Sequence, residues 1–417
     1  MTRTETFSRI VTAILVLPGM MLTGAVDAAA ADLPPGGTFW DDDGSIHEAN
    51  IEAIAAIGIT QGCNPPYNDK FCPQQAVTRG QMATFLVKAL ELPAGPTGAF
   101  TDTTGSVHEG NINSLAAAGI TTGCNPPAND RFCPDQAVTR EQMASFLVRA
   151  FRLPQSDFEF IDIEESIHAH NIRSLAAARI TVGCNPPDNT RFCPTQVVTR
   201  AQMASFLTRA LSLDPISPPP PPPVHLISRF TTYHACCEPR VDSVQSAARK
   251  LNGVVIDPRE TFSMLSLLNN VVYSGYCQTS TTLLNSAYWG GLDVVTFQPH
   301  PLNYSRYPDG LEATLVPWSV DLKIRNSFSR PVEIRSSYTG TSVTVEIWGN
   351  NDGLTRIGSF KATEPYHIST TSEGGPEAIF VRSSIQDLGE RTYRVNRWRY
   401  RGEDLISTES WTWTYRS

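Results

Sequence analysis

The chain has 417 residues and a net charge of −8 at pH 7, and 41% of its residues are hydrophobic, which excludes general disorder. Its length exceeds that of one typical domain, so two or more domains are expected. Residues 32–214 carry 20 acidic and 12 basic side chains, whereas residues 215–417 carry 19 of each. A nucleic-acid partner is not expected, because it requires a basic surface.

The first 30 residues have the pattern of a secretory signal peptide. A basic start is followed by an apolar run over residues 10–22, and small residues then supply a cleavage site after Ala28 or Ala30. An uncleaved membrane anchor is the alternative. No later stretch is long and apolar enough to span a bilayer. The mature protein is therefore expected to be soluble, free of the membrane and extracellular, at the cell surface.

One unit occurs three times along the first half of the chain. The loop GCNPPYNDKFCP at residues 62–73 returns as GCNPPANDRFCP and as GCNPPDNTRFCP, with its cysteines 61 and then 60 residues further on. Each unit opens with an aromatic residue and an aspartate, and two short helices are predicted to flank its loop. Such a unit is too small to enclose a core alone. The units are assigned to residues 36–95, 96–154 and 155–214.

Both helices of each unit have sequence signals at their ends. The first helix is predicted from a capping box, Ser45-x-x-Glu48 in the first copy, which is half lost in the third copy. Gly58 and Gly119 follow this helix and suit a left-handed cap, whereas Arg179 holds that position in the third copy. The second helix begins at a Thr-Arg-x-Gln box in every copy, and a buried apolar stripe follows it.

The chain has nine cysteines, six of them in the repeated loops. Outside the cytoplasm such pairs become disulfides, and each local bond would add about 2–3 kcal/mol by constraining the unfolded chain. A zinc site is the alternative, but its four ligands would have to come from different units. No metal or cofactor is expected. Of the other three cysteines, Cys236 or Cys237 is expected to bond to Cys277. The expected loop pairs are Cys63–Cys72, Cys124–Cys133 and Cys184–Cys193.

The three units resemble S-layer homology repeats, in the cysteine-bearing form of secreted actinobacterial proteins, over roughly residues 36–213. The aromatic-Asp opening, Gly-Ile-Thr before the loop, Phe-Cys-Pro after it and the Thr-Arg helix start carry the resemblance. Such repeats usually come in threes, form an all-α bundle with pseudo-threefold symmetry, and hold surface proteins non-covalently to an acidic secondary cell-wall polysaccharide. In the family, the arginine of the helix-start motif contacts acidic groups of that polymer, and a glutamate of the motif is glutamine here.

The matching residues form a predicted polysaccharide-binding set at three helix starts. A helix N-terminus offers free N–H groups and a partial positive charge, and an arginine there adds a planar fork that suits a carboxylate. Alternatively, the arginines pair with acidic surface residues, and Asp43 and Asp102 are candidates for holding them. His47, His108 and His168 also repeat and are interpreted as structural. The binding set is Thr78, Arg79, Thr139, Arg140, Thr199 and Arg200.

The proline run PISPPPPPPV at residues 215–224 predicts an extended spacer and a domain boundary. Beyond it the pattern changes to an extended segment, a helix over residues 241–251, a helix beginning just after Cys277, and several alternating strands. The expected fold of residues 225–350 is α+β with a mostly antiparallel sheet. Residues 351–417 are expected to add a C-terminal β-hairpin.

Residues 229–350 resemble a VanW domain, which is named for an accessory protein of glycopeptide-resistance clusters. The matching stretches include RFTTYHACCEPRV, CQTSTTLLNSAYWGGLDVV and PHPLNYSRYPDGLEATL. A glycine-rich segment that family members usually carry before the Cys-Gln motif is shortened in this chain. The resemblance implies a cell-envelope context, with peptidoglycan as the expected partner, and no established reaction.

Two functions of different class are open for this second domain. As a binding module, residues 279–285 (TSTTLLN) and the aromatic terminal hairpin would face glycan or peptide stems. As a peptidoglycan-modifying enzyme, it would use Cys277 at a helix N-terminus as nucleophile and His300 as its base. Asp321 or Asn326 would then orient the histidine.

Overall fold

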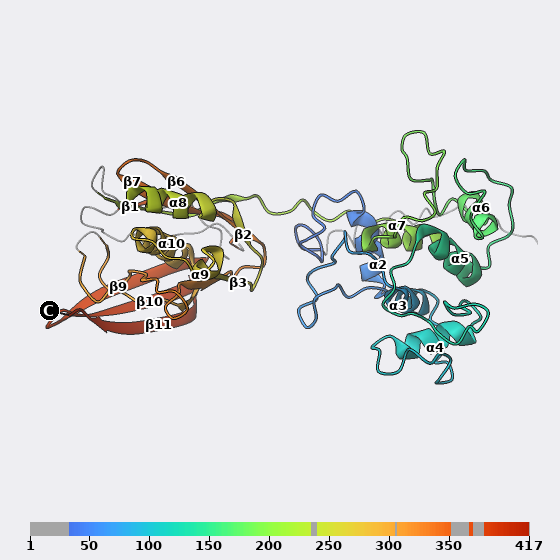
Figure 1. The fold of residues 1–417 in the computed structure, drawn as a ribbon, viewed down its shortest axis with the longest axis horizontal. Helices are drawn as coiled ribbons and strands as arrows, with labels where there is room; N and C mark the ends of the chain where they lie inside the picture. The colour runs from blue at the N-terminus through green and yellow to red at the C-terminus, as the bar shows by residue number, and fades with distance from the viewer. Residues whose placement is uncertain (1–32, 235–239, 305–306, 352–366, 370–378, 417) are drawn as a thin grey trace, which may run out of the picture. The chain divides into compact units, whose positions relative to one another are not determined.

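The chain divides at its proline run into two compact units, one ending at Pro221 and the other beginning at Pro222. The regular elements of the first unit are helices in its described part, and antiparallel sheets dominate the second (Figure 1), which confirms the expected multidomain organisation. The expected signal peptide lies outside the described residues. The computed structural model describes residues 33–234, 240–304, 307–351, 367–369 and 379–416.

The described part of the first unit contains six α-helices, two from each repeat. The first helix of a repeat has 9 residues, and the second has 11 or 12. These helices are α2 (Glu48–Ala56), α3 (Arg79–Ala89), α4 (Glu109–Ala117), α5 (Arg140–Phe151), α6 (Ala169–Ala177) and α7 (Arg200–Ala210).

The first helix of a repeat starts later than its predicted capping box. Helix α2 begins after His47, whose side chain makes no capping hydrogen bond. Ser45 Oγ instead accepts the N–H of His47, and Glu48 Oε2 accepts the N–H of Gly44. The predicted capping box is therefore wrong, because its serine and glutamate stabilise the turn that precedes the helix.

The predicted capping boxes of α3, α5 and α7 are confirmed. Thr78 Oγ1 accepts the N–H of Gln81, and the Gln81 side chain accepts the N–H of Thr78. The same pair of bonds begins α5 and α7. After the first helices, Gly58 and Gly119 are left-handed with φ of 76° and 71°. Arg179 adopts the same conformation with φ of 58°, which costs a residue with a Cβ about 1–2 kcal/mol.

The three repeats pack in a closed circle. The first helix of each repeat lies on the second helix of the preceding one, so that α4 packs on α3, α6 on α5 and α2 on α7 (Figure 1). Three backbone hydrogen bonds of 2.8–2.9 Å make a matching circle, from Val77 to Val198, from Val198 to Val138 and from Val138 to Val77. All three repeats contribute to one apolar core. Cyclic packing therefore supplies the core that a single two-helix unit lacks.

The start of the proline run is part of the first unit. The N–H of Ile216 donates to Ala49 O at 2.9 Å, and the N–H of Gly36 donates to Pro219 O at 2.8 Å. Residues 216–219 therefore lie along repeat 1 and are not free spacer, in contrast to the expectation for residues 215–224. Local hydrogen bonding to the repeat explains the difference.

The described part of the second unit contains three antiparallel sheets and two longer helices. One sheet has the strand order β2-β6-β7-β1-β8, a second β3-β5-β4, and the C-terminal sheet β11-β10-β9. The predicted helix over residues 241–251 and the predicted alternating strands are confirmed, whereas β9 was not predicted. The elements are β1 (His225–Tyr233), α8 (Val241–Leu251), β2 (Val254–Ile256), β3 (Thr261–Ser263), α9 (Met264–Leu267), α10 (Tyr276–Gly290), β4 (Asp293–Thr296), β5 (Lys323–Arg325), β6 (Val332–Tyr338), β7 (Ser342–Gly349), β8 (His367–Ser369), β9 (Ile379–Gly389), β10 (Thr392–Arg401) and β11 (Asp404–Thr414).

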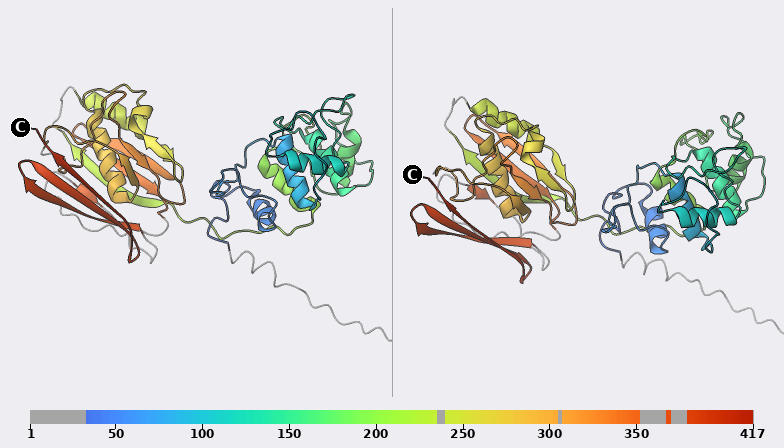
Figure 2. Two further views of the ribbon diagram at one scale, coloured as in Figure 1. Left: turned by 90° about the horizontal axis from the view of Figure 1, so that it is seen from below. Right: turned by 60° about the horizontal axis from the view of Figure 1, so that its bottom comes forward.

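Helix α10 lies between two of these sheets. It contacts β1 and β7 of the five-stranded sheet on one side and β9 of the terminal sheet on the other. The views in Figure 2 show the terminal sheet as a layer of its own beside the helices. Nearly every side chain of α10 is buried, including the three threonines and the serine of residues 279–282. The helix is thus the centre of the second unit.

Candidate functional site

The three helix-start arginines are buried and join neighbouring repeats. Arg79 Nε donates to Phe132 O at 2.6 Å, and its Nη2 donates to Gly123 O at 3.2 Å, both in the cysteine loop of the next repeat. Its guanidinium lies 4.7 Å from the centre of the Phe132 ring. Arg140 makes the same contacts to the third loop, and Arg200 makes them to the first. Each arginine is 4% exposed.

Each arginine keeps its charge in this setting. Burial lowers the pKa of Arg79, Arg140 and Arg200 to about 10, which still leaves them protonated at neutral pH. A buried cation held by carbonyl oxygens and aromatic rings is a strong link between the repeats it joins. The arginines therefore close the circle of repeats at all three interfaces.

The helix starts are not the open N–H sites that the sequence suggested. The N–H of Arg79 donates to Gln136 O at 2.9 Å, and that of Gly80 donates to Pro134 O at 2.8 Å. The equivalent N–H groups of α5 and α7 are bonded in the same way. The chain's own neighbouring loop occupies these donors, which sequence could not show. Contact of the six predicted binding residues with a polymer stays a prediction.

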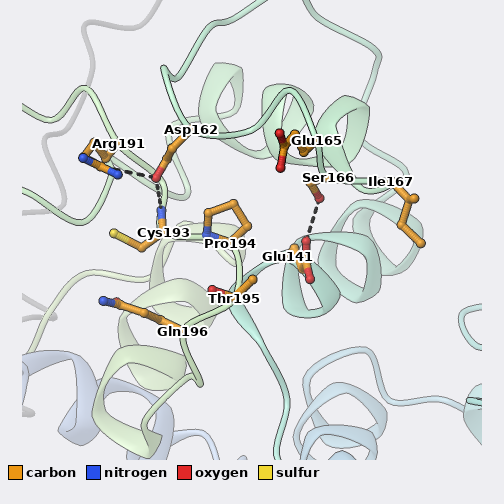
Figure 3. Close-up of a pocket in the computed structure, with 10 residues that line it drawn as sticks. All are labelled: Glu141, Asp162, Glu165, Ser166, Ile167, Arg191, Cys193, Pro194, Thr195 and Gln196. Atoms are coloured by element: carbon orange, nitrogen blue, oxygen red, sulfur yellow. Dashed lines mark hydrogen bonds and ion pairs between the residues drawn. The ribbon is translucent and has the colours of Figure 1, made fainter.

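Two pockets of opposite character lie at the repeat interfaces. One, of about 590 Å³, is lined by three carboxylates and by Arg191, which pairs with Asp162 at 3.6 Å. In it, Ser166 Oγ donates to Glu141 Oε2 at 2.6 Å (Figure 3). The other, of about 460 Å³, is lined by Arg79 and Arg149 with no carboxylate, so that it favours an anion. The rest of its lining is Thr121, Thr122, Gly123, Cys124, Pro126, Asn129, Gln136, Gln142, Ser145, Phe146, Ile167 and His168.

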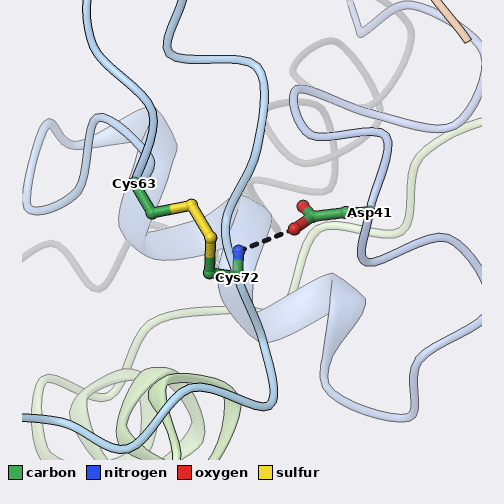
Figure 4. A group of neighbouring side chains, drawn as sticks. All are labelled: Asp41, Cys63 and Cys72. Atoms are coloured by element: carbon green, nitrogen blue, oxygen red, sulfur yellow. Dashed lines mark hydrogen bonds between the residues drawn. A yellow bond between two sulfur atoms is a disulfide. The ribbon is translucent and has the colours of Figure 1, made fainter. Parts of the chain in front are cut away.

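The cysteine loops are fixed by disulfides and by one aspartate each. Cys63 and Cys72 are bonded, with their Cα atoms 6.1 Å apart, and the other two loops match. The Asp41 carboxylate accepts the N–H of Phe71 at 2.6 Å and that of Cys72 at 2.8 Å (Figure 4). Asp102 and Asp162 do the same in their repeats. Asp102 therefore holds the loop backbone, where we expected Asp43 and Asp102 to hold the helix-start arginines. The two cysteines of each loop are paired as a disulfide, as expected.

The repeated histidines are structural, as interpreted. His108 Nδ1 lies 2.8 Å from Thr84 Oγ1, and His47 and His168 lie at the same distance from Ser205 and Ser145. In every case the partner belongs to the second helix of the preceding repeat. Each histidine therefore adds a polar link across the same helix pair that the apolar core joins.

Acid is expected to weaken the first unit through these histidines. Burial lowers the pKa of His47, His108 and His168 below the value of 6.5 that they have when unfolded. The unfolded chain then binds more protons, so their contribution is complete above about pH 6.5 and is lost as the pH falls below it. In urea titrations, the free energy of unfolding should fall less between pH 7.5 and pH 5.5 in His108→Asn than in the wild type. Exposed His170→Asn is the control and should match the wild type; equal losses in all three would contradict this role.

In the second unit, Cys277 and His300 pack against different residues. Cys277 lies in the first turn of α10, as predicted, but burial raises the pKa of its thiol, and its Sγ accepts the N–H of Leu315 at 3.4 Å. Burial lowers the pKa of His300 to about 4, and its ring packs against Tyr304 and Tyr307. No described contact joins Cys277 to His300. A nucleophilic role for Cys277 stays a hypothesis, and the raised pKa argues against it.

The groups proposed to complete such a site are used elsewhere. Asp321 accepts the hydroxyl of Ser263 and the N–H of Leu265, and the Asn326 side chain bonds three backbone groups. Cys277 has no disulfide partner among the described residues. Its expected partners, Cys236 and Cys237, lie outside them.

Comparison with known families identifies both units. The profile of the S-layer homology domain matches residues 99–144, and the profile described as VanW like protein matches residues 267–348. The chain carries an S-layer homology domain followed by a VanW-like domain. The first match covers repeat 2, whose contacts recur in repeats 1 and 3. An S-layer homology domain implies a cell-surface location, and attachment to the cell wall is the role it suggests.

A curated protein is similar to part of this chain. "Uncharacterized protein YoaR" of Bacillus subtilis (strain 168) is 23% identical over 167 residues, which covers 34% of this chain and 55% of YoaR. The chain thus spans about half the length of this relative. Within the described residues, no helix is long and apolar enough to cross a membrane.

The terminal sheet lies beyond the VanW-like match but is built into the same unit. Arg397 is fully buried, and its Nη2 donates to Tyr288 O at 2.5 Å and Leu292 O at 2.9 Å. Tyr415 donates its hydroxyl to both oxygens of the buried Glu312 at 2.9 Å. Residues 351–417 are therefore more than the expected hairpin, since β9 adds a third strand and the sheet covers α10.

Sequence reasoning missed the pair formed by Glu312 and Tyr415. Burial raises the pKa of Glu312 to about 8, so this carboxyl is largely protonated at neutral pH. The stretch DGLEATL and the terminal tyrosine are 103 residues apart, and no local signal links them. The pair shows that the VanW-like domain buries a titratable group at the contact with its terminal sheet.

Proposed function

We propose that the chain is an exported envelope protein whose S-layer homology repeats bind an acidic wall polysaccharide and whose VanW-like domain binds or organises peptidoglycan. The observation that carries the first part is the pocket of about 460 Å³, because it offers Arg79 and Arg149 without a carboxylate. Removal of the signal peptide within residues 1–30 is part of this proposal. The neighbouring pocket suits the same polymer less well, because Glu141, Asp162 and Glu165 outnumber its one cation, Arg191.

Arg149 is the better probe of polymer binding in this pocket. Its side chain is exposed on α5, whereas Arg79 is buried and joins two repeats. Lys88 and Arg209 hold the matching place on α3 and α7, so that each interface has an exposed cation on its second helix. A carboxylate-bearing sugar would meet a rigid fork at Arg149 and hydroxyl and amide donors from the cysteine loop.

Replacing Arg149 with glutamine is expected to weaken binding to purified cell walls about 5- to 20-fold without lowering stability, since one exposed charge contact is lost. Sedimentation isotherms of the full chain measure the change. Arg179→Gly, which removes an exposed cation outside the pocket, is the charge-matched control and should bind like the wild type. Equal binding by Arg149→Gln would remove this pocket from the proposal.

For the VanW-like domain, the outer face of the terminal sheet is the surface that suits glycan. Residues 279–285 cannot serve, because they are buried in α10, and this part of the expectation is wrong. The outer face instead presents Arg394, Asn396 and Trp398, and Ser410 Oγ donates to Asn396 Oδ1 at 2.9 Å. A flat row of hydroxyl and amide groups beside aromatic rings is suited to stacking on sugars. Weaker binding of Trp398→Ala to peptidoglycan stripped of its secondary polysaccharide would support this face. Unchanged binding would count against it.

A further inference from the structure

Repeat 1 differs from its two copies in the charge of one turn. Its opening turn and first helix carry Asp41, Asp42, Asp43, Glu48 and Glu52. At the matching positions repeat 2 has Asp, Thr, Thr, Glu and Asn, and repeat 3 has Asp, Ile, Glu, Ala and Arg. The formal charge of these five positions is −5, −2 and −1 in the three copies. The two other repeats therefore serve as internal controls for what the fold itself requires.

Asp42 occupies a position that the fold makes buried. It is 1% exposed, as is Thr103 in repeat 2, and Ile163 in repeat 3 is fully buried in the apolar core. Thr103 satisfies its hydroxyl by donating to Phe100 O at 3.3 Å. An ionised carboxylate has no hydrogen to donate in this way. Both carboxylate oxygens of Asp42 are buried without a hydrogen-bond partner among the described residues.

The surroundings of Asp42 are acidic. Burial raises its pKa to about 8, and the negative charge of Glu52 is the next cause, followed by those of Glu48, Asp41 and Asp43. Glu52 is itself 1% exposed, and its pKa is raised, chiefly by burial. A buried carboxylate without a partner costs several kcal/mol, so a native protein pairs it, protonates it or binds a cation to it.

The other acids of the turn differ in how far they are already used. Asp41 accepts two N–H groups of the cysteine loop, and Glu48 accepts the N–H of Gly44. Glu52 accepts the N–H and the hydroxyl of Thr38, both at 2.7 Å, and a backbone hydrogen bond from Phe39, which leaves its carboxylate about one further acceptor position. Asp42 and Glu52 are thus the two buried carboxylates with free acceptor capacity.

We propose that Asp42 and Glu52 supply the carboxylate ligands of a divalent-cation site that only repeat 1 possesses. Hard oxygen donors select Ca²⁺, whose flexible sphere of 6–8 oxygens accepts two carboxylates together with backbone carbonyls and water. So few protein charges point to a weak site, with a Kd of about 10⁻⁴–10⁻³ M, in the range of extracellular calcium modules. This inference goes beyond wall binding and does not rest on it.

The site lies where the proline segment meets repeat 1. A Cβ placed on Gly37 would come within 2.2 Å of Glu52 Oε1 and 3.4 Å of Pro218 Cβ. Ala49 lies between Glu48 and Glu52 on α2, and its carbonyl oxygen accepts the N–H of Ile216. A cation that orders Glu52 and the Asp42 turn therefore also orders the contact between α2 and the segment leading to the second unit.

Calorimetric titration of the full chain with CaCl₂ at pH 7.5 is expected to give one site per chain, and the midpoint of thermal unfolding should rise by several degrees over that in chelator. Asp42→Thr should weaken Ca²⁺ binding at least 10-fold and keep its fold, because repeat 2 has threonine there. Glu109→Gln is the matched control, since Glu109 accepts the N–H of Gly105 as Glu48 accepts that of Gly44. It should leave Ca²⁺ binding unchanged.

Terbium emission locates the ion. Trp40 precedes the acidic turn and is the only tryptophan between residues 33 and 221. Sensitised Tb³⁺ emission should therefore be lost in Trp40→Phe and displaced by Ca²⁺. No heat and no thermal shift with Ca²⁺, together with higher stability of Asp42→Thr in chelator and in Ca²⁺ alike, would overturn the proposal in favour of a protonated Asp42. Emission that survives Trp40→Phe would also overturn it.

Discussion

Replacing Arg200 with alanine is expected to lower the free energy of unfolding of the S-layer homology repeats by about 3 kcal/mol or more. Arg200 Nε donates to Phe71 O at 2.7 Å and Nη2 to Gly62 O at 3.3 Å, and its guanidinium lies between the rings of Phe71 and Phe85. Alanine leaves two carbonyl groups unpaired and a cavity between repeats 3 and 1. Urea denaturation followed by circular dichroism measures the loss.

A second variant separates the charge of Arg200 from its geometry, and a third is a control at an exposed position. Arg200→Lys keeps the charge but not the planar fork, so an intermediate loss is expected. Arg209→Ala, at an exposed position on the same helix, should change stability by less than about 0.5 kcal/mol. If Arg200→Ala were as stable as Arg209→Ala, the arginine would not close the circle of repeats.

This result bears on how wall binding is tested. Triple replacement of Arg79, Arg140 and Arg200 by alanine would release the protein from walls whether or not these residues touch polymer, because the anchor itself would be weakened. Arg149→Gln avoids the difficulty, since Arg149 is exposed and bonds one carbonyl at 3.4 Å.

Replacing Arg397 with alanine is expected to destabilise the VanW-like domain by about 3–5 kcal/mol. Its guanidinium is fully buried, stacks 4.6 Å from the Tyr288 ring, and pairs with Glu409 at 3.0 Å. It also donates to Tyr288 O in α10 and to Leu292 O just beyond the helix. Removing it takes a donor from the carbonyls of Tyr288 and Leu292 and leaves Glu409 with the longer contact to Arg399, at 3.8 Å. Denaturant unfolding followed by tryptophan fluorescence is the appropriate measurement, because six of the seven tryptophans belong to this half of the chain.

Arg394 provides the matched control for Arg397 on the same strand. It lies three residues away on the opposite, exposed face of β10, and Arg394→Ala should cost less than about 0.5 kcal/mol. A separate C-terminal hairpin, by contrast, would let Arg397→Ala unfold the terminal sheet while the rest of the domain kept its stability. We expect the terminal sheet and the rest of the domain to unfold together in one transition.

Most local signals in the sequence predicted local structure correctly, and the capping boxes of the first helices are the exception. The Thr-Arg-x-Gln boxes, the glycine caps and the disulfide loops each depend on residues within about one loop of each other. The role of the arginines was not predictable in the same way, because Arg79 bonds carbonyls 44 and 53 residues away and Arg200 bonds carbonyls 129 and 138 residues away. A motif at a helix start does not reveal which carbonyl groups of a neighbouring repeat its arginine will bond.

The second unit shows the same limit. The run TSTTLLN is polar by composition, and we expected it to face a ligand, yet α10 buries it between two sheets. Its threonine hydroxyls find partners across the fold, as when Thr282 Oγ1 lies 2.7 Å from Thr232 Oγ1. Burial of a polar helix depends on such partners from distant strands, which the order of residues alone does not give.

Co-sedimentation of the full chain with purified cell walls tests the central claim, that the S-layer homology repeats hold the protein on an acidic wall polysaccharide. The chain is expected to pellet with native walls, to stay in solution with walls stripped of their secondary polysaccharide, and to be released by the isolated polymer in excess. Equal pelleting with native and stripped walls would contradict the claim.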